Sequence, residues 1–419
     1  MSKFIINGPT KLSGEIEVNG AKNNALKILP AAILSEETIT INNLPNIEDV
    51  ERMIEILEDL GAAIEKKEEK IISISTKNIK KTEINDLLAR KLRASILLIG
   101  PLLARFREAK LPHPGGCVIG KRPIDLFLEG FKALGTTVEE NSKGFIFKAK
   151  NGLIGNKIFF PKISVTATEC LMMAAVLARG KTELHNAAME PEIPALAEYL
   201  NKQGAKITGA GTSAIIIEGV EKITAGAYDI IPDRIEAGTF TIMGILTNSE
   251  IKIKNCNPSH LESLFVKLKH IGAELEIGEN YILTKKHNGL NAADLQTHEY
   301  PGFPTDLQAP FTLLLTQARG MSLVHETVFE GRLFYTDLLA TMGANIIMCD
   351  PHRVVLNGPT KLYGKKLMSP DLRAGITMVL AGLIAEGETV IENVYQINRG
   401  YGNIDERLKA LGADIKTIE

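Results

Sequence analysis

The chain has 419 residues, of which 45% are hydrophobic and 23% are charged, and its formal net charge is −2. This length exceeds what a single hydrophobic core usually serves, so we expect two domains. The near-neutral charge excludes a globally basic nucleic-acid-binding protein, and the lack of tryptophan argues against a platform on which single-stranded bases stack.

The N-terminal stretch, the apolar runs and the cysteines predict where the protein acts. The opening residues MSKFIINGPTKLSG contain no apolar core of the kind found in secretory signals. The longest apolar runs, such as residues 96–104, reach about half the length that a membrane span needs. Four scattered cysteines in a large chain suit a reducing compartment. We therefore expect a cytoplasmic protein with no membrane partner.

In chain order, the predicted elements recur six times. Each repeat contains a strand, a short and almost wholly apolar helix, a second strand, an amphipathic helix and two more strands. The apolar helix is expected to be buried on every side and the amphipathic helix on one face. Each amphipathic helix ends near a glycine, the residue that commonly follows a helix C-terminus. The six glycines are Gly61, Gly135, Gly204, Gly272, Gly343 and Gly412.

The repeat predicts the architecture. Successive glycines are spaced by about 70 residues, and repeated supersecondary units share a core with their neighbours. Two near-identical stretches, NGPTKLSG at 7–14 and NGPTKLYG at 357–364, precede the first and the last apolar helix. We expect an α/β protein in which three repeats form each of two domains, with the chain crossing over within 219–232.

Charged residues stand where the apolar helices begin. Ordinary capping by Ser, Thr, Asp or Asn explains any single segment. Cations at the positive end of a helix are unfavourable for folding, however, and are reasonable where an anionic ligand binds among them. As a set they predict a phosphate-rich cleft, lined by the helix starts of both domains. These cations are Lys22, Arg93, Lys162, Arg234 and Arg373.

The segment LPHPGGCVIGKRP at 111–123 places Cys117 behind two prolines and two glycines, which predicts an exposed loop. Cys117 could be a structural thiol. A metal site with His113 is discounted because no second ligand pair stands at suitable spacing. A reactive thiol is favoured, because Lys121 and Arg122 stabilise a thiolate and attract an anionic substrate. The cysteines expected to be inert are Cys170 and Cys256.

The loop PGGCVIGKRPIDL resembles the UDP-N-acetylglucosamine 1-carboxyvinyltransferases, a family of enolpyruvyl transferases. Further matches are AKNN near the start, RASILLIGPLLAR, FPTDLQA, PDLRAG, and NRGYGNIDERL near the end. The resemblance covers the whole chain and implies two inside-out α/β barrels, each built from three βαβαββ repeats. Because both termini lie in one domain of that family, we expect one domain from residues 1–21 with 230–419. The other is expected from residues 22–229, with Cys117 on its loop.

The resemblance implies transfer of the enolpyruvyl group of phosphoenolpyruvate to the 3′-hydroxyl of UDP-N-acetylglucosamine, with release of phosphate. In this family the reaction is the first committed step of peptidoglycan synthesis. Cys117 matches the general acid that protonates the vinyl CH2 and that can form a covalent adduct with phosphoenolpyruvate. Asp306 matches the base that accepts the hydroxyl proton. The partners implied are these two small molecules, without nucleic acid, metal or cofactor.

The resemblance also assigns substrate contacts. Lys22, Arg122 and Arg399 match phosphoenolpyruvate contacts. Asp371 and Arg373 match residues near the reaction centre, and Arg332 matches another cation of the site. By the resemblance Cys117, Asp306, Lys22 and Arg399 are counted as catalytic residues, and Lys22 and Asp306 also as substrate contacts. The UDP-sugar contacts match Asn23, Arg93, Arg122, Pro123, Ile124, Asp125, Leu126, Lys162, Ile163, Ser164, Val165 and Val328.

Other interpretations remain open at several positions. Arg332 could be a solvated turn residue, Val328 a core residue of a strand, and Asp306 an ordinary N-cap. Thr166 stands where the family usually has glycine, which puts the local diphosphate geometry in question. At the level of function, the rivals are the shikimate-pathway enolpyruvyl transferase, a UDP-sugar sensor without turnover, and a thiol redox sensor that uses Cys117.

Overall fold

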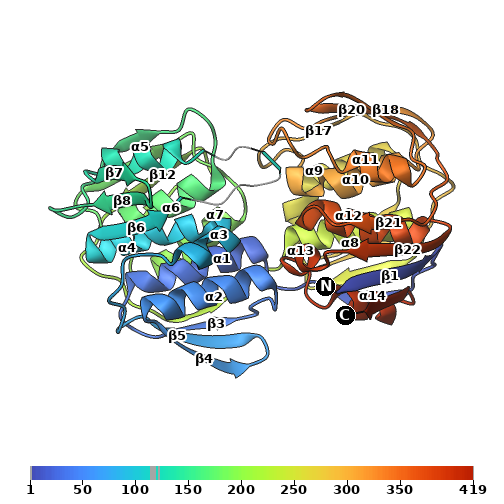
Figure 1. Ribbon diagram of the computed structural model, residues 1–419. Helices are drawn as coiled ribbons and strands as arrows, with labels where there is room; N and C mark the ends of the chain where they lie inside the picture. The colour runs from blue at the N-terminus through green and yellow to red at the C-terminus, as the bar shows by residue number, and fades with distance from the viewer. Residues whose placement is uncertain (1, 114–118, 121–122, 419) are drawn as a thin grey trace. The chain divides into compact units, whose positions relative to one another are not determined.

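The computed structural model describes residues 2–113, 119–120 and 123–418. These residues form two compact units (Figure 1). Unit 1 comprises residues 2–19, 119–120 and 232–418, and unit 2 comprises residues 20–113 and 123–231. The chain leaves unit 1 after residue 19 and returns to it at residue 232, so both ends of the described chain belong to unit 1.

Apolar helical segments form the centre of unit 2. They pack against one another because they carry buried side chains on nearly every face, as the sequence predicts. In α6, every residue from Ala167 to Ala175 is buried. The central segments are α1 (Lys22–Ala31) with η1 (Ala32–Leu34), η2 (Arg93–Leu98) with α4 (Ile99–Phe106), and α6 (Val165–Ala175).

Amphipathic helices and three sheets surround this centre. The outer helices are α2 (Glu48–Leu60), α5 (Asp125–Ala133) and α7 (Glu192–Lys202), with the short α3 (Asp86–Lys91). The first sheet has the order β13 (Ala227–Asp229), β3 (Ile39–Asn42), β5 (Ile71–Ser75) and β4 (Ala63–Glu68). The second has the order β6 (Glu108–Pro112), β8 (Gly144–Lys148) and β7 (Thr137–Asn141). The third has the order β11 (Lys206–Thr208), β12 (Ala214–Glu218), β10 (Lys181–His185) and β9 (Lys157–Phe159).

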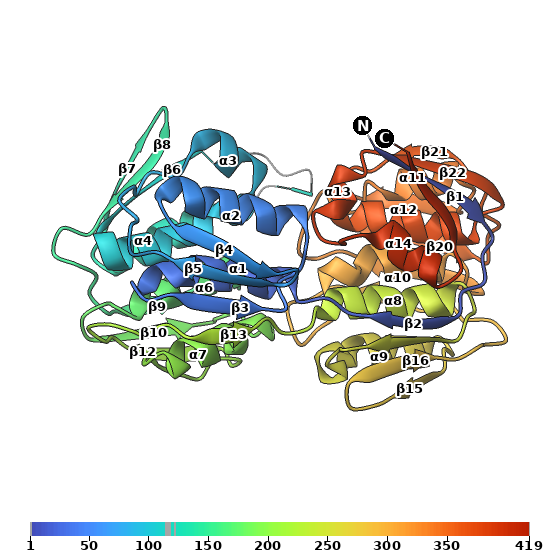
Figure 2. The ribbon, with the colours of Figure 1, turned by 90° about the horizontal axis from the view of Figure 1, so that it is seen from below.

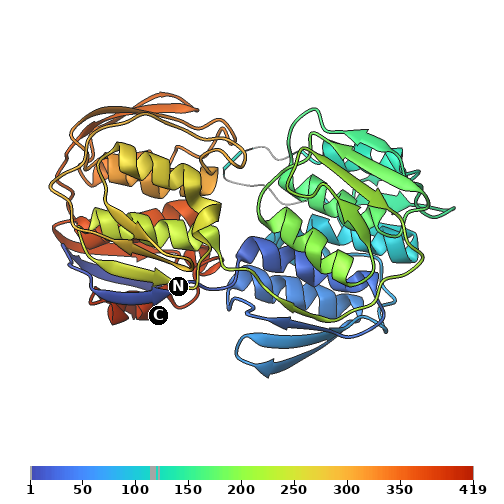
Figure 3. The same cartoon turned by 180° about the vertical axis from the view of Figure 1, so that it is seen from behind.

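Unit 1 repeats this plan. Its central helices pack against one another (Figure 3). Every residue of the first of them is buried. The central helices are α8 (Arg234–Leu246), α10 (Gln308–Leu315) after η4 (Thr305–Leu307), and α12 (Leu372–Ile384). The outer helices are η3 (Pro258–Leu261) with α9 (Glu262–His270), α11 (Thr336–Thr341), α13 (Tyr395–Asn398) and α14 (Ile404–Ala410).

Three four-stranded sheets enclose the helices of unit 1. In one of them the first and last strands of the chain lie side by side (Figure 2). That sheet has the order β21 (Lys366–Met368), β22 (Gly387–Glu392), β1 (Lys3–Gly8) and β23 (Asp414–Ile418). The second has the order β15 (Leu275–Ile277), β16 (Tyr281–Thr284), β14 (Ile251–Lys254) and β2 (Gly14–Glu17). The third has the order β17 (Leu295–Gln296), β18 (Gly320–His325), β20 (Arg353–Gly358) and β19 (Ile346–Asp350).

The structure confirms the sixfold repeat. All six marker glycines adopt positive φ, where a Cβ atom would be strained, so the period in the sequence marks true helix ends. The φ angles are +110° at Gly61, +85° at Gly135, +102° at Gly204, +90° at Gly272, +113° at Gly343 and +99° at Gly412.

Two strands are exchanged where the chain crosses between the units. β2 precedes α1 in the chain but pairs in parallel with β14, with Ile16 opposite Ile253. β13 precedes α8 but pairs in parallel with β3, with Tyr228 opposite Ile41. The first and fourth repeats therefore each give their leading strand to the other unit.

Candidate active site

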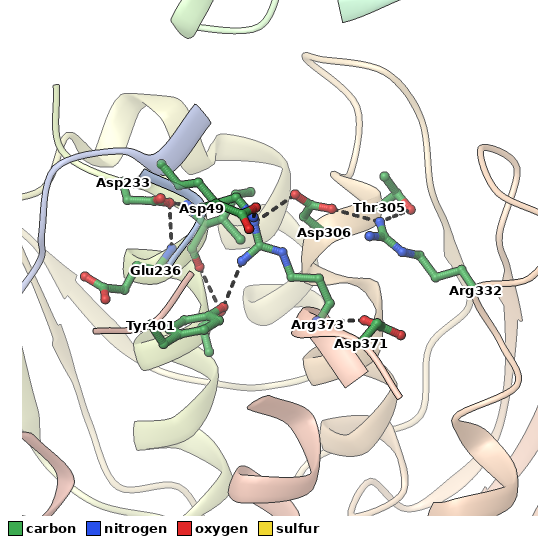
Figure 4. Close-up of polar contacts among 12 residues, drawn as sticks. Asp49, Asp233, Glu236, Thr305, Asp306, Arg332, Asp371, Arg373 and Tyr401 are labelled. Carbon is green, nitrogen blue, oxygen red and sulfur yellow. Dashed lines mark hydrogen bonds and ion pairs between the residues drawn. The ribbon is translucent and has the colours of Figure 1, made fainter. Parts of the chain in front are cut away.

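Asp306 occupies the start of a central helix of unit 1, in η4 just before α10. Its carboxylate lies between two arginines: Oδ1 accepts a hydrogen bond of 2.8 Å from Arg332 Nη1, and Oδ2 accepts one of 2.9 Å from Arg373 Nη2 (Figure 4). Both arginine side chains are 7% exposed, whereas that of Asp306 is 25% exposed. An accessible carboxylate is thus fixed in place by two buried cations.

The two arginines control the charge of Asp306. Its partial burial favours the neutral acid, but the nearby charges of Arg373 and Arg332 and their hydrogen bonds outweigh burial. The pKa of Asp306 therefore lies well below its usual range. Asp306 is ionised at any ordinary pH and can accept hydrogen bonds from a ligand.

Arg373 connects three central helices of unit 1. It is the second residue of α12, whose N-cap Asp371 accepts from the backbone N–H groups of Arg373 and Ala374 at 2.8 and 3.0 Å. Its Nη1 donates to the hydroxyl of buried Tyr401 at 3.1 Å, and that hydroxyl lies 2.9 Å from Thr239 Oγ1 in α8. The starts of α10 and α12 and the second turn of α8 therefore share one polar cluster (Figure 4).

Arg332 follows β18 in the chain and is buried. Its Nη1 donates to Thr305 Oγ1 at 2.7 Å as well as to Asp306, and its guanidinium carbon lies 5.1 Å from the ring centre of Phe329. Arg332 Nε has no hydrogen-bond partner among the residues that the structure describes. Arg332 is therefore not a solvated turn residue, which the sequence left open, and it retains a donor for a further anionic group.

In unit 2, Lys22 is the first residue of α1 and forms an ion pair of 2.7 Å with Asp49 of α2. The two side chains are 12% and 3% exposed. Lys22 and Arg373 thus have carboxylate partners within the protein. Their positions at helix starts do not by themselves require a ligand, which weakens the argument drawn from the sequence.

Other predicted contact residues of unit 2 line helix starts or adjoining loops. Ser164 caps α6 by accepting from the backbone N–H of Ala167 at 3.3 Å. Arg93 begins η2 and is half-buried. The other predicted contact residues of unit 2 differ in exposure. Pro123, Asp125 and Lys162 are exposed, and Ile124 is buried. The half-buried residues are Asn23, Leu126, Ile163, Val165 and Thr166.

Two predicted residues of unit 1 lie outside the Asp306 cluster. Val328 is half-buried and lies in the loop after β18. Arg399 follows α13, and its Nη1 donates to Gln396 at 3.0 Å. The predicted acid Cys117 and the predicted contact Arg122 lie outside the described residues, so their placement stays a prediction.

The two cysteines expected to be inert are buried. Burial raises the pKa of Cys170 to about 12 and that of Cys256 to about 11, so both remain thiols at neutral pH and the expectation is confirmed. In the described part of the chain, no group of three or more His, Cys, Asp or Glu side chains could hold a metal ion. Nor does the described chain contain a helix long and apolar enough to cross a membrane.

Sequence reasoning missed three polar residues: Asp49, which pairs with Lys22 in unit 2, and Glu326 and Tyr401, which support the Asp306 cluster in unit 1. Each has a side-chain partner more than 20 residues away in the chain, Lys22, Thr305 and Arg373 respectively, so no local spacing identifies it. The only signal in the sequence is position, because Glu326 follows a predicted strand and Tyr401 lies in the NRGYGN stretch near Arg399.

Comparisons with known proteins agree with this arrangement. Residues 6–408 match the family described as EPSP synthase (3-phosphoshikimate 1-carboxyvinyltransferase). UDP-N-acetylglucosamine 1-carboxyvinyltransferases from Koribacter versatilis and Desulforapulum autotrophicum are 44% and 43% identical to the chain. Both alignments cover 100% of this chain, with 97% and 100% of the respective relatives. The same enzyme from Coxiella burnetii is 43% identical, over 100% of this chain and 96% of the relative.

Solved structures show the same fold. The enolpyruvyl transferase NikO from Streptomyces tendae has a TM-score of 0.89 at 23% identity, covering 100% of this chain and 99% of that one. EPSP synthase from Acinetobacter baumannii has a TM-score of 0.76 at 17% identity and full coverage of both chains. The α/β fold expected from the repeats is that of the enolpyruvyl transferases. The chain belongs to the EPSP synthase family and, within it, to the UDP-N-acetylglucosamine 1-carboxyvinyltransferases.

Proposed function

We propose that this protein transfers the enolpyruvyl group of phosphoenolpyruvate to the 3′-hydroxyl of UDP-N-acetylglucosamine and releases phosphate. The observation that carries the proposal is the identity of 43–44% to enzymes of that name, over the full chain. The ionised Asp306 between two buried arginines supports it, because this chemistry needs a proton acceptor beside cations.

The reaction has two stages. First, the Cys117 thiol gives its proton to the CH2 carbon of phosphoenolpyruvate, and the 3′-hydroxyl oxygen forms a bond to C2 while Asp306 accepts the hydroxyl proton. Second, the resulting CH3 group returns a proton to the Cys117 thiolate, the C2=C3 double bond re-forms, and the bond from C2 to the phosphate oxygen breaks. Asp306 passes the proton that it accepted to the leaving phosphate, which regenerates the carboxylate, so the products are the enolpyruvyl ether and phosphate and no oxidant or reductant takes part.

The low pKa of Asp306 sets a condition on its role as base. Two arginines keep it ionised, as a base must be, but they also make the carboxylate weakly basic. We propose that anionic groups of the substrates share Arg332 and Arg373 when bound, which weakens their hold on Asp306 and raises its pKa. The Nε of buried Arg332, which has no hydrogen-bond partner among the described residues, supports this.

The remaining site residues divide by substrate. Lys22, Arg122 and Arg399 bind the phosphate and carboxylate of phosphoenolpyruvate, for which cations suit. Asp371 holds the start of α12 and so positions Arg373. The UDP-sugar is bound by Asn23, Arg93, residues 122–126, residues 162–165 and Val328.

We also propose a domain division and a location. The boundaries of the compact units, at residues 19/20 and 231/232, support two domains close to 1–21 with 230–419 and 22–229. The free state of Cys170, Cys256 and Cys349 supports a reducing compartment, the cytoplasm.

The test is a phosphate-release assay with phosphoenolpyruvate and one of two acceptors, UDP-N-acetylglucosamine or shikimate 3-phosphate. We expect release with the first acceptor only, and a product whose mass exceeds that of the acceptor by one enolpyruvyl group. D306N is the matched control, because it keeps the shape of the side chain and removes the base. Release with shikimate 3-phosphate alone would assign the rival reaction, and nucleotide binding without release would indicate a sensor.

A further inference from the structure

Glu326 is a fully buried acid for which the proposed reaction has no role. It follows directly after β18 and is 0% exposed. Its own backbone is fixed on both sides by one residue: Glu326 N–H donates to the carbonyl of His352 at 2.8 Å, and its carbonyl accepts from His352 Nδ1 at 2.7 Å. The side chain therefore starts from a rigid position.

Each carboxylate oxygen of Glu326 holds a different part of the candidate site. Oε1 accepts from the backbone N–H groups of Val328 and Phe329, at 2.8 and 3.2 Å. Oε2 accepts from the hydroxyl of Thr305 at 2.8 Å. A carboxylate is suited to this role because it accepts at both oxygens and donates at neither.

The hydrogen bond to Glu326 fixes the direction of the bonds that follow. Thr305 has a single hydroxyl hydrogen, and Glu326 accepts it, so only lone pairs of Thr305 Oγ1 face Arg332. Arg332 Nη1 carries two hydrogens and donates to Thr305 at 2.7 Å and to Asp306 at 2.8 Å. A directed chain therefore runs from Arg332 through Thr305 to Glu326, and it orients the guanidinium that holds Asp306.

We propose that Glu326 is a positioning residue for the transfer reaction, acting on two branches. Through Thr305 it orients Arg332 and hence Asp306, and through two backbone N–H groups it fixes the segment of Val328. The inference rests on the proposed function for its effect on turnover. The hydrogen-bond chain itself is independent of which substrates bind.

Glutamine cannot replace Glu326 without conflict, although the two side chains have the same shape. If its carbonyl faces the N–H groups of Val328 and Phe329, its NH2 group faces Thr305 Oγ1, and the threonine hydrogen loses its acceptor. If the amide is reversed, its NH2 group faces those two backbone donors. The first orientation is favoured because it does not place the NH2 group against two backbone donors, so E326Q breaks the Thr305 branch and weakens the Val328 branch while filling the same space.

The experiment measures kcat and both KM values for the wild type, E326Q, T305V, T305S and E326Q/T305V. We expect E326Q to lower kcat by roughly 10–100-fold, as small misplacements of catalytic groups do. Its KM for UDP-N-acetylglucosamine should rise by roughly 2–10-fold, the effect of one weakened hydrogen bond. T305V should lower kcat but change that KM by less than about twofold, because it touches one branch only. T305S, which keeps the hydroxyl, should resemble the wild type.

Non-additivity decides whether Glu326 acts through Thr305. The double variant should lie within about threefold of E326Q in kcat, because T305V removes a link that E326Q has already broken. T284V is the control for a merely structural effect. Thr284 is 0% exposed, and its hydroxyl donates to the carbonyl of Ser249 at 2.7 Å, in a sheet outside the cluster. T284V should lower the melting temperature without lowering kcat.

Two results would overturn the proposal: a folded E326Q with kcat within about twofold of the wild type, or losses from E326Q and T305V that multiply in the double variant. Should E326Q not fold, T305V with wild-type kcat would overturn it equally. Should the wild type release no phosphate with these substrates, the proposed function fails. The melting temperatures of the wild type, E326Q, T305V and the double variant are then compared instead. Additive shifts of E326Q and T305V would exclude the hydrogen-bond chain from Arg332 through Thr305 to Glu326.

Discussion

Asp306 and Arg373 are 67 residues apart in the chain, yet their side chains meet at 2.9 Å and join the starts of α10 and α12. Burial of Arg373 makes this ion pair unusual, since the arginine is 7% exposed while Asp306 remains accessible. The accessible carboxylate can therefore receive a substrate hydroxyl without leaving its cation.

The first prediction concerns the pH dependence of the reaction. Because Arg373 and Arg332 lower the pKa of Asp306, the carboxylate stays ionised as pH falls, and its protonation should not limit kcat/KM at mildly acidic pH. R373Q removes one cation, so the pKa of Asp306 rises and the acidic limb of kcat/KM should move to higher pH. The two proteins are compared by the pH at which kcat/KM declines on the acidic side, and not by the maximal value of kcat/KM. Titration of the substrates affects both proteins equally, so it does not change this comparison. An unchanged limb in R373Q would contradict this account.

The second prediction concerns Tyr401, whose hydroxyl accepts a hydrogen bond from Arg373. Thr239 donates its hydroxyl hydrogen to the carbonyl of Ile235 at 2.8 Å, so Tyr401 donates to Thr239 and accepts from Arg373. Y401F leaves a buried guanidinium N–H without its acceptor, and we expect the free energy of unfolding to fall by about 1–3 kcal/mol. Because Arg373 also loses the hydroxyl that fixes its guanidinium beside Asp306, kcat should fall too. Urea denaturation and phosphate release measure the two effects, and Y401F with unchanged kcat would show that Asp306 alone holds Arg373.

The repeat was predictable from the sequence because its signals are local. Gly61 and its five equivalents mark helix ends, and hydrophobic periodicity distinguishes central from outer helices within a few turns. The exchange of β2 and β13 was not predictable, since the period of the repeat is the same whichever unit a leading strand joins.

The polar cluster was predictable only in part. Asp306 and Arg373 stand at helix starts and could be selected, but their pairing depends on how α10 and α12 pack. The cations were interpreted as needing a ligand, whereas Lys22 and Arg373 have protein carboxylates as partners. Glu326 and Tyr401 are recognised as important only from contacts across the fold.

The third prediction concerns the thiol of Cys117. Fosfomycin is an epoxide that a reactive thiolate opens, so we expect one covalent addition, at Cys117, and faster addition when UDP-N-acetylglucosamine is present. Cys170 and Cys256 should not react because burial holds their pKa values at about 12 and about 11. Peptide mass spectrometry locates the adduct, and C349S controls for the exposed thiol.

C117D should keep turnover, since a carboxylic acid can donate the proton, but should resist fosfomycin. Full activity in C117A would contradict the role as acid.

The fourth prediction concerns a buried carboxyl group far from Asp306 in the chain. Glu169 of α6 is 0% exposed, and its carboxylate lies 3.4 Å from Nζ of buried Lys27 in α1. Burial raises the pKa of Glu169 to about 8, and the charges of Glu192 and Glu190 add to this, although Lys27 opposes it. Glu169 should therefore carry a proton at neutral pH, despite its lysine neighbour.

The sign of the effect on stability follows from proton binding. The folded state, with a pKa of about 8, holds the proton of Glu169 more tightly than the unfolded chain, whose value is near 4.5. The stabilisation is complete below pH 4.5 and is lost as pH rises through about 8. Each unit of pKa difference corresponds to about 1.4 kcal/mol, so the free energy of unfolding should fall by a few kcal/mol over this range.

E169Q tests this assignment because glutamine mimics the protonated acid. At pH 6 we expect E169Q to be more stable than the wild type by about 2 kcal/mol, because ionisation of Glu169 already stabilises the unfolded wild type above pH 4.5 and glutamine does not ionise. The stability of E169Q should also change less between pH 6 and 9. E198Q, in an exposed carboxylate of α7, should keep the pH dependence of the wild type. Urea denaturation at several pH values measures all three proteins. A loss of about 3–5 kcal/mol in E169Q at pH 6 would instead indicate an ionised Glu169 paired with Lys27, because breaking a buried ion pair leaves the lysine charge uncompensated.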